Sequence, residues 1–231
     1  CIPGPDDAFR WAKGEEIPGG GDGTPLKAKV PLDWYMVSDH AEYLGVFKKM
    51  EDSSSPISKL PIAKEVTSTD RSVAFMAFSR VLDGVNTGIP DPDLNDPEVS
   101  TSIWQEVVKI ADRHNDPGKF TTFSGFEYTS APDKRNLHRV VIFQDSDVMP
   151  DLPFSTFDSD RPEDLWAWMD QQRANGSELL AITHNGNASN GLMFPETKSY
   201  GGRGLNKEYA EKRMRKETVY EVSQVKGTSE T

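Results

Sequence analysis

Residues 32–40, Leu-Asp-Trp-Tyr-Met-Val-Ser-Asp-His, form a short apolar run that ends in polar side chains. An apolar run of this length, with aromatic and β-branched members, predicts a buried strand. Residues 41–50 have the composition of a helix, so together the two segments predict a strand–helix unit. A similar passage returns later, where a helix opened by Asp-Arg-Pro-Glu at residues 160–163 precedes the apolar run Leu-Leu-Ala-Ile-Thr-His at 179–184. The two passages predict an α/β fold.

Two further strands are predicted between these passages, at residues 121–127 and 137–143. If they pair as an antiparallel hairpin, Glu127 and His138 become neighbours. Helices that alternate with short strands are typical of a mostly parallel α/β sheet or barrel, in which the chemistry gathers beyond the carboxyl ends of the strands. The remaining expectations are a loop at 53–64, a largely buried helix at 70–82, a helix from Asp96 to near His114 and a last strand at 218–225.

Composition predicts one acidic globular domain over residues 1–231. Hydrophobic residues make up 35% of the chain and charged residues 27%, which is enough to bury a core beneath a solvated surface. The formal net charge of −11 opposes binding to nucleic acids and to anionic membranes. No apolar run approaches the ~20 residues that span a bilayer. Cys1 is the only cysteine, so any bound metal must use His and carboxylate ligands.

Four side chains form the strongest chemical constellation in the sequence. His40 follows one predicted strand, His184 ends another, and His138 begins a hairpin arm that faces Glu127. Imidazole nitrogen and carboxylate oxygen are ligands for Zn²⁺, Mn²⁺ or Fe, and one carboxylate can bridge two ions. Any single histidine here is also explained as a hydrogen-bonded turn residue. The four together favour a metal site that holds two or three divalent ions.

His114 differs from these histidines, because it ends a predicted helix, where an imidazole complements the helix dipole. We expect it to be structural. A serine hydrolase is excluded as well, because the chain has no Gly-x-Ser-x-Gly nucleophile elbow.

Other residues have two open readings each. Asp39 is a candidate catalytic residue or ligand that orients an imidazole, and it is equally an ordinary helix N-cap. Asn185 can donate to a bound anion or satisfy a tight turn. Arg139 and Lys226 are candidates to bind substrate phosphate, with surface salt bridges as the alternative. Glu221 and Glu230 are weaker candidates for an added ligand.

Several stretches resemble the bacterial family called domain of unknown function 3604, a relative of the polymerase and histidinol phosphatase (PHP) superfamily. The resemblance covers nearly the whole chain, and it is carried by residues 32–45, 120–130, 136–139, 183–187 and 226–230. It implies a distorted, TIM-like β/α barrel that holds up to three metal ions and hydrolyses phosphoesters with a metal-activated hydroxide. On this chain Glu127 would match the bridging carboxylate, His138 and His184 its imidazole co-ligands, and His40 a ligand of another metal.

The chain departs from the superfamily pattern at both ends. It holds neither the initial His-x-His strand nor the final Asp-x-His motif, and it opens with Cys-Ile-Pro-Gly in place of an initiator Met. The sequence is therefore interpreted as an internal fragment with an incomplete barrel, and weak or absent activity is expected of it alone.

The leading functional hypothesis is a metal-dependent hydrolase of a small phosphorylated molecule. One alternative keeps the metals but cleaves a non-phosphate ester or amide. The other is a catalytically silent module that binds metal or ligand. Oligomeric state and a cytoplasmic, periplasmic or secreted location are left open by the sequence.

Overall fold

A five-stranded sheet forms the centre of the computed structural model, which describes residues 4–19, 24–225 and 227–229. Its strands lie in chain order, β1-β2-β3-β4-β5. β1 is parallel to β2, β3 is antiparallel to both of its neighbours, and β4 is parallel to β5, so only β3 runs against the others. The strands are β1 (Trp34–Val37), β2 (Thr121–Tyr128), β3 (Arg139–Phe143), β4 (Leu179–Thr183) and β5 (Val219–Tyr220).

The expected TIM-like β/α barrel is wrong. The sheet of the described residues is open and mixed, because β1 and β5 are its two edges and β3 lies antiparallel in its middle. The connection from β2 to β3 contains only the short 3-10 helix η2 (Pro132–Lys134). A parallel return would need a crossover of a dozen or more residues, usually with an α-helix, so β3 must come back antiparallel.

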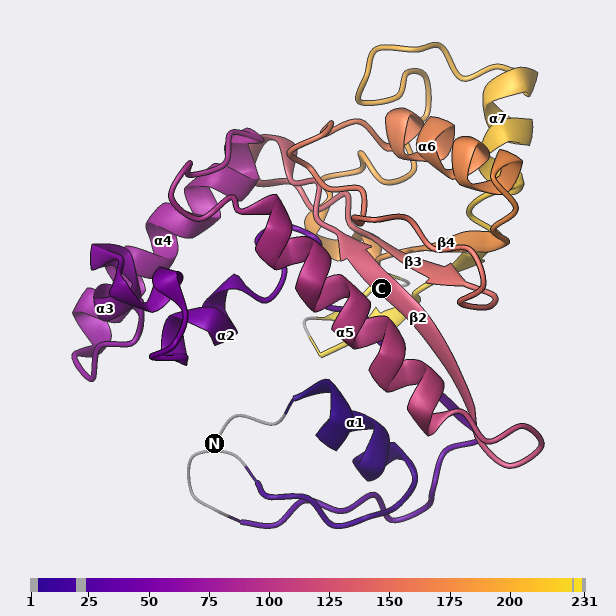
Figure 1. Cartoon of the computed structure of the whole chain (residues 1–231). Coiled ribbons are helices and arrows are strands. Elements are labelled where there is room, and N and C mark those ends of the chain that lie inside the picture. The colour runs from indigo at the N-terminus through magenta and orange to yellow at the C-terminus, as the bar shows by residue number, and fades with distance from the viewer. Residues whose placement is uncertain (1–3, 20–23, 226, 230–231) are drawn as a thin grey trace.

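Two long helices cover one face of the sheet, α5 (Pro97–His114) and α6 (Pro162–Ala174) (Figure 1). Asp96 caps α5 as expected, since its carboxylate accepts the N–H groups of Glu98 and Val99. The core under these helices is aromatic and aliphatic, and its largest members are Trp104, Trp166, Phe126, Tyr128 and Phe143. The strand residues between these positions, such as Val140 and Ile182, point to the other face and are only half-buried. That second face carries the candidate site.

A helical arm spans residues 46–87 and projects sideways from the sheet (Figure 1). Its own small core gathers around Val46, Ile62, Val81 and Val85. The expected loop at 53–64 is wrong, because Pro56 and Pro61 each open a helical turn there. The arm consists of α2 (Val46–Glu51), η1 (Pro56–Lys59), α3 (Pro61–Val66) and α4 (Arg71–Thr87).

The expectation of a largely buried helix near 70–82 is also wrong. α4 buries only a narrow stripe, Ala77, Val81 and Val85. Phe75 and Met76, which lie outside this stripe, are 68% and 65% exposed. The apolar residues on most faces of α4 therefore do not show that most of its faces are buried.

The N-terminal helix α1 (Pro5–Ala12) packs on the C-terminal half of α5. His114 Nε2 lies 2.9 Å from Asp6 Oδ1, and the His114 ring stacks on Phe9 at a centroid distance of 5.3 Å. The structural role expected of His114 is confirmed. Gly14 follows α1 with a φ of +83°, a backbone conformation that favours glycine at the end of a helix.

The C-terminal region holds α7 (Lys207–Met214) and two two-residue strands, β6 (Ser223–Gln224) and β7 (Gly227–Thr228). The single last strand expected at 218–225 is divided into β5 and β6, because β6 leaves the main sheet and pairs with β7. Among the described residues, no helix is both long and apolar enough to cross a membrane.

Candidate metal centre

The pairing of β1 with β2 brings His40 next to Glu127. The two strands run in parallel with Val37 opposite Ser124, and an isolated bridge continues the same register to His40 opposite Glu127. The Glu127 N–H donates to the Asp39 carbonyl at 2.8 Å and fixes this register. The apolar strand at 34–37 therefore delivers an imidazole from its carboxyl end to a carboxylate on the neighbouring strand.

β3, β4 and β5 extend this arrangement across the sheet. Arg139 lies opposite Thr183, and one step further out the His184 N–H donates to the His138 carbonyl at 3.2 Å. The Glu221 N–H donates to the Thr183 carbonyl at 2.9 Å, which places Glu221 beside His184. Each strand thus contributes one ligand-type side chain at the same end of the sheet. We call these five residues the ligand row, namely His40, Glu127, His138, His184 and Glu221.

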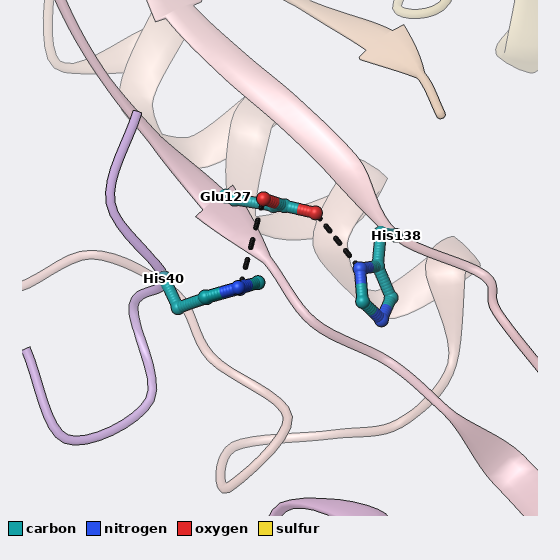
Figure 2. Close-up of side chains that lie close together, drawn as sticks. All are labelled: His40, Glu127 and His138. Carbon is teal, nitrogen blue, oxygen red and sulfur yellow. Dashed lines mark hydrogen bonds and ion pairs between the residues drawn. The ribbon is translucent and has the colours of Figure 1, made fainter. Parts of the chain in front are cut away.

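Glu127 lies between His40 and His138 (Figure 2). Its Oε1 atom is 2.8 Å from His138 Nδ1 and 3.9 Å from His184 Nε2, whereas its Oε2 atom is 3.6 Å from His40 Nδ1. One ligand atom from each of His40, Glu127 and His138 lies within 4.8 Å of the others, the spacing that a shared metal ion needs. His184 Nδ1 is also 3.4 Å from Glu221 Oε2. The two oxygens of Glu127 therefore face different imidazoles.

The protonation states suit metal binding. Burial lowers the pKa of His138, so its imidazole is neutral near pH 7. Since a carboxylate only accepts, His138 Nδ1–H donates to Glu127 and Nε2 keeps a free lone pair. Burial alone would raise the pKa of Glu127, but the hydrogen bond from His138 and the nearby charges of His40 and His184 outweigh it, and the pKa lies below its usual value. Glu127 is ionised.

Neighbouring polar side chains orient the ends of the ligand row. The Thr129 hydroxyl lies 2.6 Å from His40 Nδ1, the nitrogen that also faces Glu127 Oε2, and so helps to fix the orientation of the ring. At the other end, Gln224 Nε2 is 2.8 Å from His184 Nε2 and 3.3 Å from Glu221 Oε2. His40 is the exposed member, with 56% of its side chain accessible, so the centre is open on that side.

The grouping differs in detail from the one predicted. Glu127, His138 and His184 were expected to share one metal, with His40 at another position. The structure makes His40, Glu127 and His138 the compact group and sets His184 beside Glu221. Sequence reasoning rated Glu221 weak, because its place in the row follows from the parallel pairing of β4 with β5, which no sequence pattern reveals.

Asp39 lies beside the ligand row but outside the compact group. It is exposed, and the helix it was thought to cap begins only at Val46, with Gly45 at the N-cap position. Its backbone carbonyl accepts the Glu127 N–H, so its structural contribution is to the register of β1 and β2.

The expected substrate contacts are placed elsewhere. Arg139 is not directed into the ligand row: its side chain is 3% exposed and its Nε donates to Glu217 Oε1 at 2.9 Å in a buried ion pair. Asn185 is fully buried, and its amide donates to the Gly227 carbonyl at 2.9 Å. The Asn185 side chain therefore ties the end of β4 to Gln224 and Gly227, and neither the anion contact nor the tight-turn role expected for it is seen. Lys226 and Glu230 lie outside the described residues.

Comparison with protein families gives one result, a match of residues 2–231 to the model described as "Protein of unknown function (DUF3604)". The chain belongs to this family. The sequence resemblance to the DUF3604 family is thereby confirmed over nearly the whole chain. Neither the curated proteins nor the solved structures contain a significant match. What this DUF3604 protein does must be inferred from the geometry of its ligand row.

Proposed function

We propose that this DUF3604 protein is a metal-dependent hydrolase that acts on a small phosphoester. The observation that carries the proposal is the ligand row itself, in which each of five adjacent strands places an imidazole or a carboxylate at the same end of the sheet. A structural role for each residue alone would not require them to converge. Glu127 and His138 are partly buried and have pKa values shifted from their usual range, as is typical of ionisable groups in functional sites.

The donor set fits divalent transition metals. Three imidazoles and two carboxylates provide nitrogen and oxygen ligands of the kind that Zn²⁺, Mn²⁺ and Fe accept, without any thiolate. Glu127 offers one oxygen toward His40 and the other toward His138 and His184, which is the arrangement that a carboxylate shared by two ions requires. We therefore propose at least two metal ions, and three where a further position is completed.

Bound metal ions would supply a hydroxide at neutral pH and offset the charge that develops on the phosphoryl oxygens. The residues of the chain have complementary tasks. Glu127 and the neutral imidazole of His138 would hold the ions without adding positive charge of their own, and Thr129 fixes the ring of His40. The exposed side of His40 leaves an approach for the substrate. We also propose, on the motif resemblance alone, that the family is related to the PHP phosphoesterases.

Metal analysis tests the ligand assignment. We expect the purified protein to bind Mn²⁺ or Zn²⁺, and Glu127→Ala and His184→Ala each to lower the affinity by more than the 10- to 100-fold that changes around a ligand typically cost. Glu98→Ala is the matched control, because Glu98 is an exposed carboxylate in the first turn of α5. Unchanged metal content in both ligand variants would contradict the site.

A substrate panel tests the reaction class. The metal-loaded protein is offered phosphate monoesters, phosphate diesters and carboxylate esters, with Glu127→Ala as the inactive reference. We expect release of phosphate from one of the phosphoester classes that depends on metal and on Glu127. Turnover of carboxylate esters alone, or tight metal binding without turnover of any ester, would contradict the phosphoesterase proposal.

A further inference from the structure

A cavity of about 620 Å³ opens directly beside the ligand row. It lies between the loop after β1, α2, α4 and α5, and this volume falls within the range of small-molecule sites. Most of its lining is apolar, and the principal apolar side chains are Phe47, Phe78, Val81, Leu82, Val85 and Ile103.

The cavity and the candidate metal centre share residues. His40 and Thr129 line the cavity, and the same two side chains are in contact with each other at 2.6 Å beside Glu127. Asp39, next to His40, lines it as well. A molecule that reaches the exposed side of His40 with one end therefore has the cavity available for its other end. This continuity identifies the occupant as part of the molecule that the metal centre handles.

The polar groups of the lining restrict the chemistry of that occupant. Four carboxyl-bearing residues line the cavity against a single cation, Lys48. A second negative charge on the occupant is thus disfavoured. A sugar is disfavoured too, because hydroxyls buried against apolar walls lose hydrogen bonds to water without replacement. The carboxyl-bearing residues are Asp39, Glu42, Glu51 and Glu106.

The Glu42 carboxylate is buried behind the cavity wall. It is 5% exposed, and its Oε1 atom accepts the N–H groups of Thr129 at 3.2 Å and Thr156 at 2.7 Å. Its Oε2 atom has no hydrogen-bond partner among the described residues. Because the Oε2 atom is buried, it offers no accessible surface to which a hydroxyl-rich occupant could hydrogen-bond.

We propose that the cavity holds the uncharged apolar alcohol part of an anionic ester, while the anionic head lies at the metal centre. The proposal rests on the proposed hydrolase function for the identity of the head group. It names the substrate class of that site, phosphate esters of aryl or bulky alkyl alcohols, and it excludes sugar phosphates and esters whose alcohol part itself carries a negative charge.

Calorimetric titration with non-hydrolysable phosphonates tests the cavity without requiring turnover. The three probes are naphthylmethylphosphonate, methylphosphonate and a naphthylmethylphosphonate that carries a ring carboxylate, each titrated with and without Mn²⁺. We expect the uncharged naphthyl probe to bind about tenfold or more tightly than methylphosphonate, because it buries far more apolar surface. We also expect the added carboxylate to remove most of this advantage.

Two residues of α4 give a matched pair of variants. Phe78 lines the cavity and is 43% exposed, whereas Phe75, on the same helix, does not line it and is 68% exposed. Phe78→Ser should weaken binding of the naphthyl probe by about tenfold and leave methylphosphonate unchanged, whereas Phe75→Ser should change neither. Leu82→Trp, which adds bulk at another lining position, should give the same selective loss. Circular dichroism confirms that each variant is folded.

The outcomes separate this proposal from the proposed function. If the metal centre fails its own test, a naphthyl preference that depends on Phe78 and Leu82 still supports the cavity as an apolar subsite. If the protein binds metal and hydrolyses esters, yet the naphthyl and methyl probes bind equally, the cavity proposal is overturned while the hydrolase stands. Equal losses in Phe78→Ser and Phe75→Ser would overturn it as well.

Discussion

The end of the sheet that carries the ligand row and the helical arm differ in how their positions are fixed. At the end of the sheet that carries the ligand row, backbone pairing sets the neighbours of each residue. His184, one residue beyond β4, therefore has a defined neighbour, His138. In the arm, α4 buries only one narrow stripe and leaves Phe75 and Met76 in solvent. Pairing thus places side chains more strictly than an apolar helix surface does.

This difference has a functional counterpart. The end of the sheet that carries the ligand row holds charged and polar groups at set distances, which is what a metal centre needs. The arm contributes apolar walls to the adjacent cavity, where shape and polarity matter more than the exact position of any atom. The variants below test whether the two regions are as different as their contacts indicate.

Glu217→Gln should have the largest effect on stability. Glu217 is 1% exposed, and it joins β3 to α7 through Arg139 Nε at 2.9 Å and Arg213 Nε at 2.8 Å. Removing one partner of a buried ion pair leaves the others uncompensated and costs about 3–5 kcal/mol. Urea unfolding followed by circular dichroism measures the free energy of unfolding. Glu211→Gln is the control, since Glu211 forms only an exposed pair with Lys207 and should change stability by less than about 0.5 kcal/mol.

The same variant predicts a pH dependence. Burial alone would raise the pKa of Glu217, but Arg139 and Arg213 outweigh it and hold the pKa below its usual value near 4.5. A carboxyl with a depressed pKa in the folded state stabilises the protein above the unfolded pKa, and this contribution is lost as the pH falls through the folded pKa. The stability difference between wild type and Glu217→Gln should therefore be full at neutral pH and shrink below about pH 4.5. A difference that stays constant down to the acid limit would contradict the ion-pair account.

Thr129→Val should have an intermediate effect, confined to the metal centre. The variant keeps the shape of the side chain but removes the hydroxyl that lies 2.6 Å from His40 Nδ1. Loss of such an orienting contact typically lowers metal affinity by about 10- to 100-fold. Thr122→Val is the control: Thr122 lies on β2, the strand that Thr129 directly follows, and its hydroxyl donates to the Ala111 carbonyl of α5 and not to the ligand row. Equal metal affinities in the two variants would mean that Thr129 does not orient His40.

Sequence reasoning succeeded where local chemistry determines the structure. The apolar runs that became β1 to β4 were visible, and the hairpin that places Glu127 beside His138 follows from the short connection between two strands. The predicted barrel is wrong because the number of strands, their closure into a barrel and the direction of β3 depend on long-range pairing. Glu221 was undervalued for the same reason, since only its backbone bond to Thr183 shows that it joins the ligand row.

Phe75→Ser should have the smallest effect and sharpens the comparison most directly. Phe75 is 68% exposed, so its replacement should change the free energy of unfolding by less than about 0.5 kcal/mol. Val81→Ala on the buried stripe of the same helix is the contrast, because Val81 is 2% exposed and loses two buried methyl groups, at a cost of about 2 kcal/mol. Urea unfolding at several protein concentrations measures both. If Phe75→Ser lowers the free energy of unfolding as much as Val81→Ala does, the outer face of α4 is covered in solution. The position of the arm is then fixed as strictly as that of the ligand row.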